Sequence, residues 1–107
     1  MVERILTFDV DRQRLTRSRR CDFSHIVANS RGYLKARFYF STEWVGCHKV
    51  ATFSYNGTEE SVMLDKYDKC EIPANVLTGD HFYVKVLGGK NDFRIESSKI
   101  KVMQEVT

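Results

Sequence analysis

The sequence predicts an all-β fold, an antiparallel, immunoglobulin-like β-sandwich of about eight short strands with at most one helical turn. Apolar and polar residues alternate in Tyr33–Phe40, His81–Val86 and Lys99–Val102, which is the pattern of half-buried strands. Apolar residues nowhere follow the helical period for longer than one turn. The 107 residues are expected to form a single domain, 1–107, because a chain of this length buries one modest core.

Further strands are expected at Ile5–Asp9, Lys49–Tyr55, Glu60–Leu64, Lys69–Ile72 and Phe93–Glu96. Asn56-Gly57 predicts a type I′ turn, polar Asp65–Asp68 predicts a hairpin between its flanking strands, and Gly88–Asp92 predicts a third connection. Only Pro73–Leu77 is expected to be helical, with proline at the first helical position. The connections look too short for crossovers, so antiparallel pairing is expected.

The net charge of +3 is unevenly distributed. Residues 1–40 contain nine Lys or Arg against four acids, whereas residues 41–107 contain eight against ten. Within a basic strand or loop region, residues 10–32, the excess comes mostly from Arg12, Arg14, Arg17, Arg19 and Arg20. Arginine pairs bidentately with carboxylates and phosphates, so these residues are candidates for binding a partner. The alternative interpretation is an ordinary solvated basic segment.

The three cysteines, Cys21, Cys47 and Cys70, are widely spaced and odd in number. This pattern favours reduced thiols in a reducing compartment over a disulfide framework. The sequence begins without a signal-peptide pattern and contains no apolar run long enough to cross a bilayer. We therefore expect a protein that is not secreted and has no membrane partner.

The sequence nominates no catalytic residue, no metal ligand and no cofactor. Asp22, Ser24 and His25 are the residue types of a hydrolase triad, but near neighbours in one segment cannot converge as that triad requires. The four residues that could in principle bind zinc are Cys21, His25, Cys47 and His48. Their spacing matches no usual zinc motif. The chain is expected not to be an enzyme.

An aromatic and basic sheet face is predicted at the outward positions Tyr33, Lys35, Arg37 and Tyr39, extended by His81, Tyr83 and Lys85. Such faces stack single-stranded bases, so a nucleic-acid-binding β-domain is one hypothesis. The alternative is a solvated or interface-facing strand, because Tyr has a high strand propensity and Lys protects sheet edges. No RNP1-like segment supports the nucleic-acid hypothesis.

Five segments occur in an order that resembles a known family: Phe40–Gly46 with its Trp44, Lys49–Phe53, Val62–Asp65, Cys70–Leu77 and Phe82–Gly88. Over residues 33–106 this order is similar to the small β-sandwich of structural proteins of tailed bacteriophages of Gram-positive hosts, notably the N-terminal domain of the baseplate upper protein. The resemblance carries no active site. It implies a structural β-sandwich whose partners are other phage structural proteins, with self-association also considered.

The baseplate protein continues beyond this sandwich, whereas the present sequence ends at Thr107. A small non-enzymatic virion component is therefore expected, in the head decoration, neck, tail or baseplate, located in the virion or the host cytoplasm. The alternatives are a phage-encoded inhibitor of a host protein, such as a CRISPR-type nuclease, and the nucleic-acid binder described above.

Overall fold

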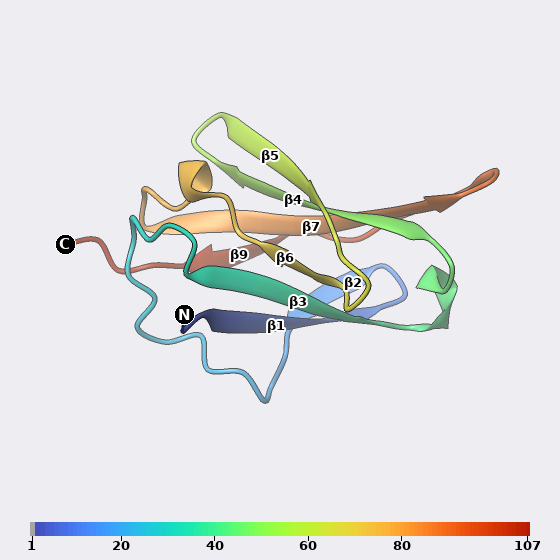
Figure 1. Cartoon of the computed structure of the whole chain (residues 1–107), viewed down its shortest axis with the longest axis horizontal. Helices are drawn as coiled ribbons and strands as arrows, with labels where there is room; N and C mark the ends of the chain where they lie inside the picture. Colours follow the sequence, from blue (N-terminus) through green and yellow to red (C-terminus); the bar gives the residue numbers. More distant parts are fainter. Residues whose placement is uncertain (1) are drawn as a thin grey trace.

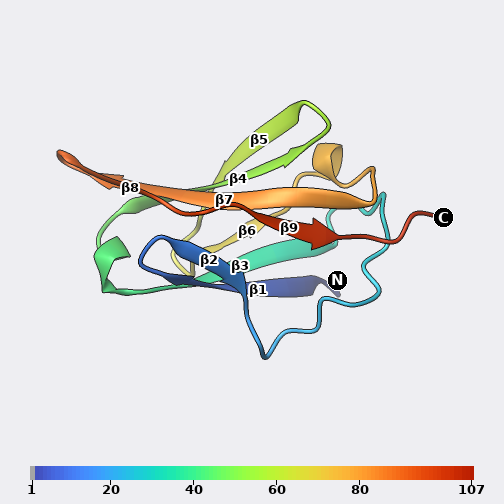
Figure 2. The same cartoon turned by 180° about the vertical axis from the view of Figure 1, so that it is seen from behind.

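A computed structural model describes residues 2–107 and confirms the all-β sandwich (Figure 1). One sheet has the strand order β2-β1-β3-β6 and contains β1 (Arg4–Asp11), β2 (Arg14–Arg17), β3 (Leu34–Phe40) and β6 (Lys69–Glu71). The other has the order β5-β4-β7, with both β8 and β9 on the far side of β7, and contains β4 (His48–Tyr55), β5 (Thr58–Met63), β7 (His81–Lys90), β8 (Phe93–Glu96) and β9 (Ile100–Met103). Figure 2 shows the two layers from behind.

The core lies between the two sheets and follows the alternation of the sequence. Leu34, Ala36 and Phe38 of β3 are buried, as are Phe82 and its alternate neighbours in β7. From β1, Phe8 stacks on Phe38 with ring centroids 5.2 Å apart. Burying one face of each strand is the main source of stability in such a sandwich.

One strand pairing is parallel, contrary to the expectation that all would be antiparallel. β1 and β3 run in the same direction over seven residue pairs, from Arg4↔Leu34 to Val10↔Phe40. A parallel pair needs a long connection. Here the basic region supplies it, because β2 forms a hairpin with β1 and residues 18–33 then carry the chain back to the start of β3.

The predicted turns are partly confirmed. Asn56 and Gly57 have φ angles of 49° and 82°, as a type I′ turn requires. The hairpin predicted around Asp65–Asp68 is wrong, because β5 and β6 belong to different sheets and this segment connects the layers. The connection predicted at Gly88–Asp92 is shorter than expected, since β7 continues to Lys90 before it turns into β8.

The helical content of the described part of the chain is two 3₁₀ turns. η2 (Ala74–Val76) lies within the segment predicted to be helical, with Pro73 just before it as its N-cap. η1 (Thr42–Trp44) was not expected, and it brings Trp44 into the core as a fully buried side chain. Within the described residues no helix is long and apolar enough to span a membrane.

The two sheets are joined along one edge by the β8–β9 connection. The Leu15 backbone N–H donates to Ser98 Oγ at 3.0 Å, and the Ser98 N–H donates to the Gln13 carbonyl at 2.7 Å. Gln13 Nε2 also donates to the Glu96 carbonyl at 3.1 Å. We call these contacts the edge clasp. They hold the arginine-bearing strand β2 beside β9 of the opposite sheet.

Candidate functional site

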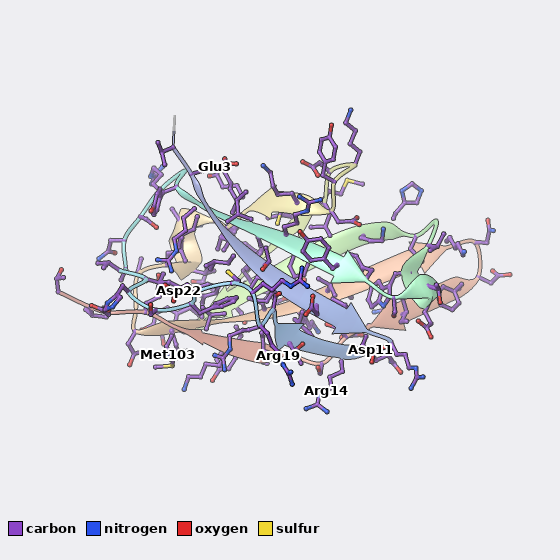
Figure 3. The ribbon with its side chains drawn as sticks, turned by 90° about the horizontal axis from the view of Figure 1, so that it is seen from below. Glu3, Asp11, Arg14, Arg19, Asp22 and Met103 are labelled. Atoms are coloured by element: carbon purple, nitrogen blue, oxygen red, sulfur yellow. The ribbon has the colours of Figure 1, made fainter. Side chains whose placement is uncertain are left out.

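Five exposed cations gather on and beside this clasped edge. We call them the cationic ridge, and they are Arg14, Arg17, Arg19, Arg20 and Lys101. Figure 3 shows Arg14 and Arg19 along the same margin of the molecule, with Met103 further along it. Among residues 2–107, no carboxylate lies within 4.0 Å of any of the five charged groups. The ridge therefore presents unneutralised positive charge to solvent.

Two open hollows flank the ridge. The larger, of about 1270 Å³, runs along the outer face of β1 beneath residues 18–25 and includes Arg17, Arg19 and Arg20 in its lining. The smaller, of about 590 Å³, lies between β2 and β9, where its lining includes Arg14 and Lys101. Arg17 lines both hollows, and its Nη1 donates to the Lys101 carbonyl at 3.4 Å. Exposed cations therefore line a concave surface on each side of the ridge.

The loop that lines one side of the larger hollow is held by Arg4. Its guanidinium donates to three backbone carbonyls, those of Asp22 at 2.8 Å, Ser24 at 2.7 Å and His25 at 3.2 Å. Beneath the same loop, Cys21 Sγ accepts a hydrogen bond from the Thr7 N–H at 3.4 Å. These contacts fix the position of the segment that carries Arg19 and Arg20.

Asp22, Ser24 and His25 do not form a catalytic chain. The Asp22 carboxylate accepts hydrogen bonds from the Ser24 hydroxyl at 2.6 Å and from its backbone N–H at 2.8 Å, which lower the pKa of Asp22. The His25 ring instead meets Glu105 Oε2 at 3.0 Å through Nδ1. The arrangement stabilises a turn, because the histidine is not bonded to the hydroxyl.

The four predicted β3-face residues differ in how they are placed. Tyr33 and Tyr39 line the larger hollow and are 43% and 49% exposed. Lys35 is neutralised, because its Nζ lies 2.9 Å from Glu71 and 4.0 Å from Glu3. The Arg37 guanidinium lies over the Tyr39 ring, 5.1 Å from its centroid.

Arg12, the remaining candidate, lies exposed in the β1–β2 turn, where its carbonyl accepts a hydrogen bond from Trp44 Nε1 at 2.7 Å.

The extension of this face to His81, Tyr83 and Lys85 is wrong. These residues belong to β7 in the second sheet. Their outward side chains therefore lie on the outer face of that sheet, on the other side of the sandwich from Tyr33 and Tyr39. Two of them are engaged locally, His81 with Asp80 at 2.6 Å and Lys85 with Glu96 at 2.7 Å. These hydrogen bonds lower the pKa of Asp80 and that of Glu96.

The residues considered for zinc do not come together. Among the described residues, no group of three or more His, Cys, Asp or Glu side chains is arranged to hold a metal ion. Cys21 lies under the loop of the first sheet, whereas Cys47 and His48 lie at the start of β4 in the second. Cys21, Cys47 and Cys70 are all free thiols.

Sequence reasoning located the arginines but missed Lys101 and the hollow that it lines. The signal that could have found Lys101 is the alternation in Lys99–Val102, which places position 101 outward. Its position beside β2 depends on the edge clasp, which no local pattern encodes. No protein-family model matches the chain, and a search of curated proteins finds no match.

Proposed function

We propose that the chain is a non-enzymatic docking protein that binds an acidic protein surface through the cationic ridge. The observation that carries this proposal is the set of five exposed cations without a carboxylate partner among residues 2–107, arranged between two hollows. Each exposed ion pair contributes only about 0.2–1 kcal/mol, so useful affinity requires several pairs acting together.

Two properties of the ridge favour recognition of carboxylates: most of its cations are arginines, and the segments that carry them are held in place by hydrogen bonds. Four of the five ridge cations are arginines, whose planar guanidinium forms two parallel hydrogen bonds with one carboxylate. The edge clasp holds β2, and Arg4 holds the loop of Arg19 and Arg20, so less conformational entropy is lost on binding. Tyr33 and Tyr39 add aromatic surface to the larger hollow.

We assign this docking protein to a tailed-phage particle, with other structural proteins of the particle as its partners. Support comes from the sequence resemblance over residues 33–106 and from the β-sandwich fold, which leaves both outer faces free for contacts. Repeated copies on a symmetric particle would turn weak individual contacts into firm attachment.

The test is incorporation into particles of the phage that encodes the chain. Mass spectrometry of purified particles is expected to find it in many copies. The triple charge reversal Arg17→Glu, Arg19→Glu and Arg20→Glu should abolish incorporation. A control with the same change in net charge, Arg31→Glu, Lys66→Glu and Arg94→Glu, alters exposed cations outside the ridge and should be incorporated normally.

Two results would overturn the proposal. Absence of the chain from purified particles, together with one stoichiometric partner captured from host lysate, would favour the host-protein inhibitor. Binding of a duplex DNA probe that exceeds binding of a polyglutamate probe, with a steep salt dependence lost in the ridge variant, would favour the nucleic-acid binder.

A further inference from the structure

We propose that two copies of this chain associate through the free edge of β5, pairing antiparallel about a two-fold axis at Ser61. This inference does not depend on the proposed function, because the two surfaces are separate. β5 is one edge strand of its sheet, whereas the ridge follows β2, the segment after it and β9, and β9 lies on the far side of β7 from β5. It identifies a second interaction surface and its occupant.

The edge of β5 is open. β5 is the terminal strand of its sheet and, among residues 2–107, pairs only with β4 (Figures 1 and 2). Leu64 N–H donates to the Lys49 carbonyl, so Val62 and Glu60 also bond to β4, given the alternation of an antiparallel ladder. The backbone groups of Glu59, Ser61 and Met63 therefore point away from the sheet. An open row of this kind is a template for another strand.

The edge lacks several of the features that usually prevent such pairing. Residues 58–63 contain no proline and no lysine, and the register with β4 is unbroken over all six. Met63 is 68% exposed, a large apolar side chain at the end of the open row. Two glutamates, Glu59 and Glu60, are the only charged residues in the strand.

The edge can pair with its own copy along its whole open row in one register. With Ser61 opposite Ser61 of the second copy, Glu59 lies opposite Met63, and Glu60 lies opposite Val62. The three residues whose backbone groups point away from the sheet, Glu59, Ser61 and Met63, then form hydrogen-bonded pairs with the second copy. These pairs give about six backbone hydrogen bonds. A register centred on Glu59 would place like charges directly opposite each other, which is destabilising. Like-charge repulsion therefore disfavours that register, and the register centred on Ser61 is the one that pairs all three residues of the open row within both strands.

A second copy is the occupant that this geometry favours. The isologous pairing buries Met63 of both copies beside the aliphatic part of Glu59 and joins two five-stranded sheets edge to edge. It also leaves the β2–β9 edge of each copy uncovered, so a dimer would present two cationic ridges.

The experiment compares paired substitutions at Met63 by sedimentation equilibrium of the full chain over micromolar to submillimolar concentrations. The wild type is expected to approach twice the 12.5 kDa monomer mass as the concentration rises. Met63→Glu places a carboxylate opposite Glu59 and should weaken dimerisation at least about tenfold. Met63→Lys places a cation there and should preserve or strengthen it. Both changes are at an exposed side chain.

A second pair of variants tests the backbone. Ser61→Pro removes the outward N–H, which β4 does not use, and should abolish the dimer. Ser61→Ala loses the same hydroxyl, which contacts Thr52 at 3.0 Å, but keeps the N–H and should still dimerise. A wild type that stays monomeric throughout, or Met63→Glu and Met63→Lys variants that dimerise equally well, would overturn the proposal.

Discussion

Gly88 lies directly against the indole ring of Trp44, so closely that a Cβ at position 88 would be 2.8 Å from Cε3 of the ring. The indole cannot withdraw, because Trp44 is fully buried and its Nε1 donates to the Arg12 carbonyl at 2.7 Å. The glycine thus allows β7 to pass the tryptophan that links η1 to the β1–β2 turn.

Replacing Gly88 by alanine is expected to lower the free energy of unfolding by about 1–3 kcal/mol, the usual cost of overpacking a core. The shift of the urea midpoint measures the loss. Gly89→Ala is the matched control in the same strand, because its added Cβ would meet only the Phe93 carbonyl oxygen at 3.6 Å, an ordinary contact. Equal stability of the two variants would show that the tryptophan adjusts freely.

Arg4→Lys is expected to loosen the loop that carries Arg19 and Arg20. Lysine cannot reproduce the forked geometry by which Arg4 reaches the carbonyls of Asp22, Ser24 and His25, so the stability loss should be about 1–2 kcal/mol. Limited trypsin digestion should then cleave faster after Arg19 and Arg20. Arg31→Lys, at an exposed arginine elsewhere in the chain, should leave cleavage after both residues unchanged.

The Cys70 thiol should make the fold sensitive to alkaline pH. Burial, with a smaller contribution from Asp65, raises the pKa of Cys70 from 9.0 to about 12. The unfolded chain releases this proton near pH 9, whereas the folded chain retains it. The contribution of Cys70 to stability is therefore complete below pH 9 and falls by about 1.4 kcal/mol for each pH unit above it, until the folded-state pKa is reached.

Urea unfolding of wild type and Cys70→Ala at about pH 8 and about pH 10.5 isolates this effect from other titrating groups. The alanine variant should be less stable at the lower pH, because it leaves a small cavity. The difference between the two proteins should shrink as the pH rises. A difference that stays constant would show that the thiol ionises normally in the folded state.

The sequence predicted which side of β3 and which side of β7 is buried, because the two-residue period assigns that side directly. Leu34, Phe38, Phe82 and Val84 are buried as their alternation requires. The same period does not say which sheet a strand joins. For that reason the outward residues of β3 and β7 were predicted to share one face. The strands on either side of Asp65–Asp68, β5 and β6, were likewise predicted to form a hairpin, although they belong to different sheets.

Local sequence patterns also could not predict the direction of β3 relative to β1 or the position of Lys101 beside the ridge arginines, because both depend on contacts between distant residues. The parallel pairing of β1 and β3 depends on the path of residues 18–33, whose contacts come from distant groups such as the Arg4 guanidinium. Composition located the ridge arginines. Lys101 joins them only because Ser98, some eighty residues away in sequence, bonds to Leu15.

The edge clasp gives the last prediction. Ser98→Ala removes the acceptor of the Leu15 N–H and is expected to cost about 1 kcal/mol, since that amide lies at a partly buried edge. Exchange of the Leu15 amide hydrogen should accelerate more than exchange in β7, because the loss is local. Thr78→Ala, at an exposed residue of the η2–β7 connection, serves as the control. Because the clasp sets the position of Arg14 and Arg17 relative to Lys101, Ser98→Ala should also weaken docking through the ridge. Unchanged Leu15 exchange in this variant would contradict the hydrogen bond on which that geometry depends.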